Sequence, residues 1–181
     1  MDFIIKIIQT LLSFFISDEE SDHRNVFNFI ISSDDTEIVD SILTKFILDK
    51  CDTIAWTNYG RTSMFGPKWE KDPEFIEQME HFQSELIKKT LDNIECGEMI
   101  HKRSVFNHYF FKLSGNVKKF VEEQGVISVA PGFWDPIYFK GKKMVAAVIA
   151  HEPIVMLNLT DNEAEKLHAR GVKMYMRDKY I

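Results

Sequence analysis

The sequence is poor in the residues and motifs that mark several large classes of protein. Its two cysteines, Cys51 and Cys96, are too few for a disulfide framework or a four-cysteine zinc site. No apolar run reaches the roughly 18–20 residues of a membrane-spanning helix. The glycine motifs that bind phosphates or dinucleotides do not occur, nor does the Gly-x-Ser-x-Gly nucleophile motif. We therefore expect no membrane span, no cofactor, and two buried, unreactive thiols.

The sequence does contain enough apolar material for a folded domain. Its 181 residues are 45% hydrophobic and include 15 Phe and three Trp. This composition is typical of a globular protein and excludes disorder as the main state. We expect one domain over residues 1–181, with a division into a helical part (1–124) and a small α/β part (125–181) as the alternative.

Charge is distributed unevenly along the chain. The net charge is −6, but residues 1–100 carry −11 and residues 101–181 carry +5. An acidic half argues against nonspecific nucleic-acid binding, which requires a basic surface. It favours a basic protein as the partner, although an acidic surface also serves solubility alone.

Polar residues recur at every third or fourth position of the first segment, Met1–Ile16, which predicts an amphipathic helix. A signal peptide would have a basic start and a small-residue cleavage site. In this segment the first charged residue is Asp2, and Lys6 is the only basic residue. The acidic run Ser17–Asp22 follows it. We expect this helix to pack on the core or on a partner, a homodimer being compatible with that, and we expect a cytoplasmic protein.

Helical patterns dominate the chain up to residue 124. Capping residues and apolar positions three or four apart predict helices in this part. They cover approximately residues 34–50, 53–56, 73–95, 99–112 and 117–123, with Ser33 and Asp72 as N-caps.

The pattern changes to short apolar runs after Gly125. Strands are predicted over residues 126–130, 137–139, 144–150, 154–159 and 172–176. One helix follows the capping box Thr160–Glu163 and ends at Gly171. We therefore predict an α+β fold, in which an N-terminal helical bundle-like region precedes a small, mostly antiparallel sheet with one helix.

Two groups of residues are candidates for chemistry. Glu77, His81 and Glu85 are spaced to share one side of a helix, but a metal site also needs ligands from a second element, and none is identifiable. We expect a solvated helix face and no metal. The pair His151-Glu152 lies between two predicted strands, where it would suit a small active site or a simple turn.

Aromatic residues gather in two predicted loop regions. Trp56, Tyr59 and Arg61 lie close together in the sequence, and Trp134 lies in a second loop bounded by prolines. Trp, Tyr and Arg dominate the contact energies of protein interfaces. These residues are therefore candidate anchors for a partner, the alternative being that the rings close the core over the loop ends.

The segment Phe46–Asp52, which follows an acidic-capped helix, resembles a helix–Cys-Asp–helix segment of uncharacterised bacterial proteins. Such proteins occur as immunity partners of secreted toxins. The resemblance covers fewer than ten residues and implies an intracellular inhibitor that blocks a cognate toxin. It assigns no catalytic residue.

We therefore predict a cytoplasmic bacterial binding protein of the toxin-immunity type, which occludes a basic partner such as a cognate toxin. Trp56, Tyr59, Arg61 and Trp134 are the expected anchors. The expected acidic contacts are Asp34, Asp35, Glu37 and Asp40, or Glu74, Glu77 and Glu80. The alternatives are a small enzyme with its site near His151 and Glu152, and a phage or plasmid protein that inhibits a host defence system.

Overall fold

The computed structural model describes residues 25–30, 36–58, 73–93, 105–126, 132–149 and 154–176. The α-helices in these ranges are α2 (Thr36–Lys50), α3 (Pro73–His81), α4 (Gly115–Gln124) and α5 (Asp161–Ala169), and a short 3-10 helix, η4 (Gln83–Glu85), follows α3. No helix in the described ranges is long and apolar enough to cross a membrane.

In the described ranges, eight strands form one antiparallel sheet in the order β3-β4-β2-β5-β6-β7-β1-β8. The strands are β1 (Asn25–Ile30), β2 (Thr53–Asn58), β3 (Leu86–Asn93), β4 (Val105–Lys112), β5 (Trp134–Lys140), β6 (Lys143–Ile149), β7 (Ile154–Leu159) and β8 (Tyr175–Met176). Strand β2 pairs with β4 on one side and β5 on the other, so the parts of the chain before and after residue 125 share one sheet.

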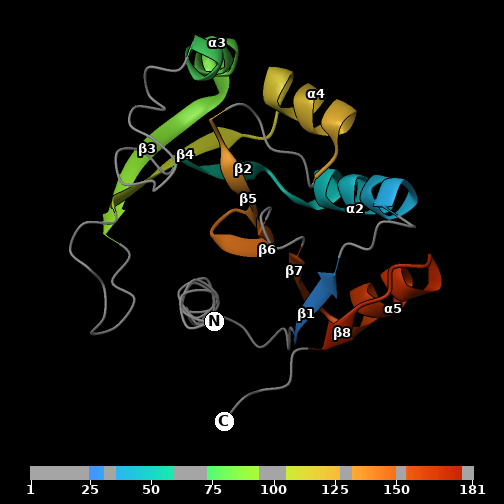
Figure 1. Cartoon of the computed structure of the whole chain (residues 1–181). Coiled ribbons are helices and arrows are strands. Elements are labelled where there is room, and N and C mark those ends of the chain that lie inside the picture. The colour runs from blue at the N-terminus through green and yellow to red at the C-terminus, as the bar shows by residue number, and fades with distance from the viewer. Residues whose placement is uncertain are drawn as a thin grey trace.

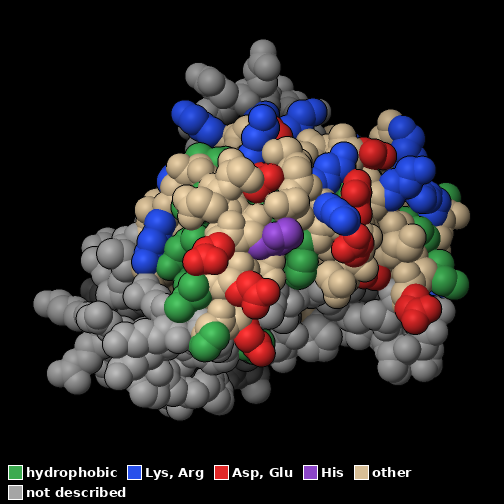
Figure 2. Space-filling model, turned by 90° about the horizontal axis from the view of Figure 1, so that it is seen from above, with side chains coloured by type: hydrophobic (Ala, Val, Ile, Leu, Met, Phe, Trp, Pro, Cys, Tyr) green, Lys and Arg blue, Asp and Glu red, His purple; other side chains and the backbone are tan. Residues whose placement is uncertain are grey.

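Helices α2, α3, α4 and α5 share one core with the sheet. Their buried residues, such as Leu43 of α2, Val121 of α4 and Leu167 of α5, belong to a single apolar cluster with the inward side chains of the strands. Figure 1 shows α3, α4 and α2 next to one another along the sheet, with α5 beyond α2. The outer side of this layer carries acidic and basic side chains in close mixture (Figure 2).

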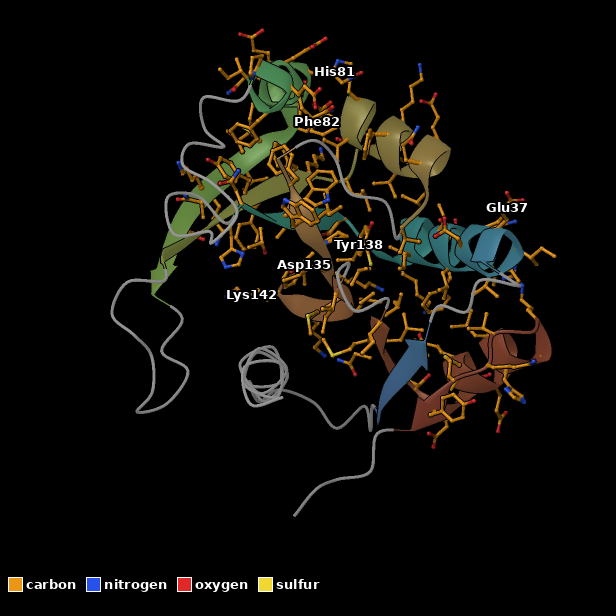
Figure 3. The ribbon with its side chains drawn as sticks, in the orientation of Figure 1. Glu37, His81, Phe82, Asp135, Tyr138 and Lys142 are labelled. Atoms are coloured by element: carbon orange, nitrogen blue, oxygen red, sulfur yellow. The ribbon has the colours of Figure 1, made fainter. Side chains whose placement is uncertain are left out.

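An aromatic cluster fills the core beneath α3 and α4. Trp56 of β2 is stacked on Phe82, with ring centroids 5.6 Å apart and planes 9° from parallel. Phe111 and Phe133 lie 5.5 and 5.4 Å from the same indole. Figure 3 shows Phe82 on the side of α3 that faces the sheet. Because aromatic side chains bury large areas, this cluster fixes α3 and α4 over β2 and β4.

The sheet has a second, smaller apolar cluster on its other side. Met144, Ala147, Ile149 and Met156 are at most 3% exposed, and along β6 and β7 they are interspersed with residues of the first cluster. Strands that are buried on both faces have continuous apolar sequences rather than alternating ones, as these two strands do.

Several predictions are confirmed. The fold is α+β, helices form at α2, α4 and α5, and strands form at β5, β6 and β7. The capping box of α5 is present, because Glu163 N donates to Thr160 Oγ1 (3.3 Å) and Thr160 N donates to Glu163 Oε2 (3.0 Å). The helix predicted from Pro73 begins there.

The helical bundle-like region predicted before residue 125 is not confirmed. Residues 53–56 belong to strand β2, the helix from Pro73 ends at His81, and residues 86–93 form strand β3. Where a helix was predicted over residues 99–112, strand β4 runs from Val105. Short apolar runs fit either element, and strand pairing with neighbours distant in sequence decided these cases. The helix predicted for Met1–Ile16 lies outside the described residues.

Candidate partner-binding groove

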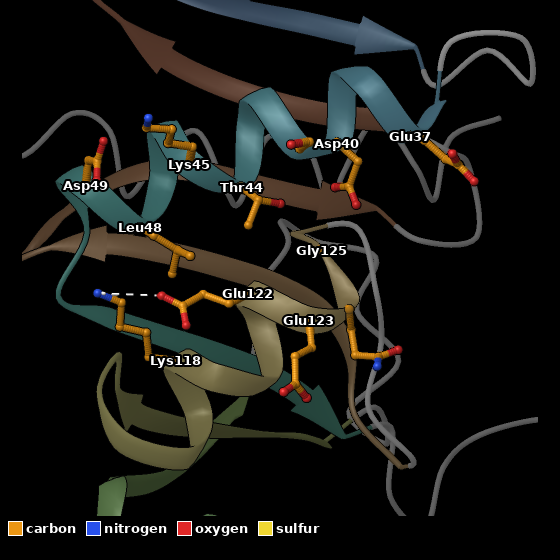
Figure 4. A pocket seen from close by; sticks show the side chains of 12 residues that line it. Glu37, Asp40, Thr44, Lys45, Leu48, Asp49, Lys118, Glu122, Glu123 and Gly125 are labelled. Carbon is orange, nitrogen blue, oxygen red and sulfur yellow. Dashed lines mark ion pairs between the residues drawn. The ribbon is translucent and has the colours of Figure 1, made fainter.

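A groove of about 490 Å³ lies between α2 and α4. Its lining residues are Glu37, Asp40, Ser41, Thr44, Lys45, Leu48 and Asp49 from α2, and Lys118, Glu122, Glu123, Gln124 and Gly125 from α4 and its C-terminal end. Figure 4 shows Thr44 and Leu48 pointing from α2 towards α4. The groove is therefore bounded by two helices and open to solvent between them.

Helical periodicity explains which side chains line the groove. Val39, Leu43 and Ile47 of α2 are 0–5% exposed and face the core, as do Val117 and Val121 of α4. Residues offset from these positions lie on the flanks of the helices, where polar side chains remain in contact with water. The flank of α2 and the flank of α4 face each other across the groove.

The groove has a local excess of negative charge. Five carboxylates (Glu37, Asp40, Asp49, Glu122 and Glu123) line it together with two lysines (Lys45 and Lys118). Lys118 Nζ lies 3.8 Å from Glu122 Oε1, and both side chains are about half exposed (45% and 51%), so this pair is largely screened by solvent. Carboxylates from two helices that face a shared concavity attract cations to it more strongly than they would on a flat surface.

Hydrogen bonds fix one end of the groove. The Val126 N–H is shared between Asp40 Oδ1 (3.1 Å) and Thr44 Oγ1 (3.0 Å), and Tyr138 Oη donates to Val126 O (3.0 Å). Burial raises the pKa of Tyr138 well above its ordinary value, so this hydroxyl keeps its proton. Val126, two residues after the end of α4, is thus tied to α2 and to β5.

A second carboxylate fixes the opposite end of α4. Glu85 is only 9% exposed, and its Oε1 accepts from Asn116 N (3.1 Å) in the first turn of α4. Ser84 Oγ donates to Glu85 Oε2 (2.6 Å). A carboxylate at this position satisfies an unpaired helix N–H and complements the positive end of the helix dipole.

The helix face predicted to be shared by Glu77, His81 and Glu85 does not form. Helix α3 ends at His81, and Glu85 lies in η4 and caps α4. In the described ranges no three histidine, cysteine or carboxylate side chains are placed to hold a metal ion.

The structure brings together part of the predicted acidic contacts. Glu37 and Asp40 both line the groove, whereas Glu74, Glu77 and Glu80 are exposed on α3. Asp34 and Asp35 lie outside the described residues. Sequence analysis did not single out Asp49, Glu122 or Glu123, because nothing local indicates that α2 and α4 pack side by side.

The predicted anchor residues differ in how far the structure exposes them. Trp56 as a contact residue is wrong, because its side chain is 0% exposed at the centre of the aromatic cluster. Trp134 is half-buried at the start of β5, and Tyr59 and Arg61 lie outside the described residues. The alternative, that a ring closes the core, holds for Trp56.

Sequence analysis did not identify two exposed apolar side chains as candidate contact residues. Ile38 is 69% exposed beside Glu37 at the start of α2, and Ile76 is 44% exposed beside Glu77 on α3. The register of α2 carries the signal for Ile38, since this residue falls outside the spacing of Val39, Leu43 and Ile47. An apolar residue next to an acidic concavity gives a partner both a charged and an apolar contact.

The cysteine in the described ranges is inert. Cys51 is buried after α2, and burial, followed by the neighbouring Asp52 carboxylate, raises the pKa of its thiol to about 12. It is therefore a protonated thiol at neutral pH, as expected. Cys96, His151 and Glu152 lie outside the described residues.

Comparison with known proteins identifies no similar protein. No family model matches the chain, and neither a curated protein nor a solved structure matches it.

Proposed function

We propose that this chain is a cytoplasmic bacterial binding protein of the toxin-immunity type, which occludes a basic partner protein. The observation that carries the proposal is the groove between α2 and α4, which is lined by five carboxylates and two lysines. Basic side chains of the partner would enter this concavity. The exposed Ile38 beside it would contribute apolar contact area.

The mechanism is steric and electrostatic. Like-signed charges on two helices produce a field that extends about 8 Å at physiological salt, which speeds encounter with a basic surface. Once the partner is bound, α2 and α4 cover its surface. Because the core and the two capping carboxylates hold both helices, little conformational entropy would be lost on binding.

The test is affinity capture from the native host with the chain as bait, at low and high salt. We compare the wild type with Glu122→Lys in the groove and with Glu165→Lys, an exposed glutamate of α5 outside the groove. Both variants change the net charge equally. We expect one stoichiometric basic partner, reduced at least tenfold by Glu122→Lys and by high salt, and unaffected by Glu165→Lys.

A third variant distinguishes the two acidic surfaces. Glu77 lies on the exposed side of α3, outside the groove. Loss of capture in Glu77→Lys but not in Glu122→Lys would overturn the groove as the contact surface. Capture of no stable partner by the wild type would overturn the proposed function itself.

A further inference from the structure

The turn between β5 and β6 is a protruding basic tip. Lys140 and Lys143 are paired across the hairpin, and Lys142 lies between them in the turn (Figure 3). All three side chains are exposed, and within the described residues none of them forms an ion pair. A Cβ added at Gly141 would meet no atom within 4 Å, so the tip stands clear of its surroundings.

This tip is held next to one end of the groove. Gly141 N donates to Asp52 Oδ2 (2.9 Å), and Asp52 N donates to Phe139 O (2.9 Å). Asp52 comes three residues after Asp49, which lines the groove. The basic tip therefore lies close to the end of α2 that carries Asp49, at one end of the groove.

We propose that two copies of this chain associate about a two-fold axis, each placing its hairpin tip in the α2–α4 groove of the other. A two-fold interface brings the same surface of both copies together, so every contact is made twice. A surface that carries a basic protrusion beside an acidic concavity is complementary to itself in this arrangement. The three lysines of one copy then meet the carboxylate excess of the other, and the contact closes with two molecules.

The dimer would regulate the groove. This step rests on the proposed function, because the second copy occupies the surface that the basic partner uses. Charge pairs at an exposed rim contribute little each and are screened by salt. The self-contact would therefore be weak, and a more basic partner would displace the second copy.

The test is a charge exchange followed by sedimentation velocity. One variant, Lys140→Glu/Lys142→Glu/Lys143→Glu, makes the tip acidic. The other, Asp49→Lys/Glu122→Lys/Glu123→Lys, makes the groove basic. Each variant alone places like charges at both contacts, whereas an equimolar mixture of the two places opposite charges at both. Circular dichroism confirms that each variant is folded.

We expect the wild type to dimerise at low salt, with a dissociation constant that rises about tenfold or more between 50 and 300 mM salt. Each variant alone is expected to be monomeric, and the mixture is expected to form a 1:1 dimer. The control Lys166→Glu/Arg170→Glu/Lys173→Glu has the same charge change as the tip variant but lies on α5 and the segment after it, so it should still dimerise.

Three results would overturn the inference. They are a wild type that stays monomeric at low salt, a tip variant that dimerises as well as the wild type, and folded variants whose mixture stays monomeric. The dimer and the proposed function fail separately. Dimerisation without any captured partner supports the dimer alone, and capture by a monomeric wild type supports the binding function alone.

Discussion

The two glycines at the ends of α4 sit where a carboxylate leaves no room for a side chain. A Cβ at Gly115 would overlap Glu85 Oε1, and a Cβ at Gly125 would overlap Asp40 Oδ2. Gly125 also has a φ of +84°, in the region that disfavours other residues. The backbone conformation therefore requires glycine here, and a larger side chain would also have to displace the Asp40 carboxylate.

Gly125→Ala acts on both requirements at once, because φ +84° with ψ 166° is a conformation that only glycine adopts readily. Gly141 also has a positive φ (+58°), but nothing crowds its Cβ position, so Gly141→Ala carries the backbone strain alone. We expect Gly141→Ala to lower the free energy of unfolding by about 1 kcal/mol, and Gly125→Ala to lower it by about 1–2 kcal/mol more. Urea unfolding measures both, and equal losses would contradict the role assigned to Asp40.

Cys51 predicts a dependence of stability on alkaline pH. Its ordinary pKa is 9.0 and its folded pKa is about 12, so the unfolded chain releases the proton first. The contribution is complete below pH 9 and decreases between pH 9 and 12, by at most about 1.4 kcal/mol per pH unit. The buried Tyr138, whose pKa is also raised, acts in the same direction.

Cys51→Ala isolates the thiol from Tyr138. We expect the difference in unfolding free energy between wild type and variant to be constant below pH 9 and to shrink as the pH rises above it. Urea unfolding at intervals from pH 7 to 10.5 measures this difference. A difference that stays constant throughout would show that the thiol does not titrate as its burial requires.

Sequence patterns predicted individual residues where the cause was local. The acidic start of α2 and the capping box of α5 follow from residues a few positions apart. Trp56 was assigned to a contact surface because residue type alone does not show burial. Its position depends on Phe82, Phe111 and Phe133, which come from three distant parts of the chain.

Helices with capping signals were predicted well, and strands β2, β3 and β4 were not. In β4 the apolar residues Tyr109 and Phe110 belong to opposite faces, since Tyr109 is opposite Trp56 and Phe110 is opposite Ala55. A strand with apolar residues on both faces has no clear alternation and can match helical spacing by chance. Pairing with β2 and β3 determines the outcome, and sequence spacing does not contain that information.

Helix α4 depends on η4 for its N-terminal hydrogen bonding. Glu85→Ala removes the acceptor of the Asn116 N–H, whereas Glu85→Gln keeps an acceptor oxygen. We expect Glu85→Ala to lower the free energy of unfolding by about 1–2 kcal/mol, and Glu85→Gln to lower it by less. Urea unfolding measures the loss of unfolding free energy in each variant. Equal losses would mean that the negative charge matters rather than the hydrogen bond.

The whole molecule combines an acidic groove with a basic hairpin, and both features depend on tertiary packing. The groove exists because α2 and α4 pack side by side on the sheet, and the hairpin tip is held by Asp52 after α2. The sequence showed the separation of charge between its two halves. Only the fold shows that Asp40 and Glu122, two carboxylates 82 residues apart in the sequence, line one concavity.

Carboxylate footprinting of the captured complex shows whether the partner occupies the groove between α2 and α4. Exposed Asp and Glu side chains are labelled with a carbodiimide and an amine, in the free chain and in the complex, and the sites are counted by mass spectrometry. We expect Glu37, Asp49, Glu122 and Glu123 to lose labelling in the complex, and Glu165 on α5 to keep it. Unchanged labelling of the groove, with protection on α3 or α5 instead, would contradict this expectation.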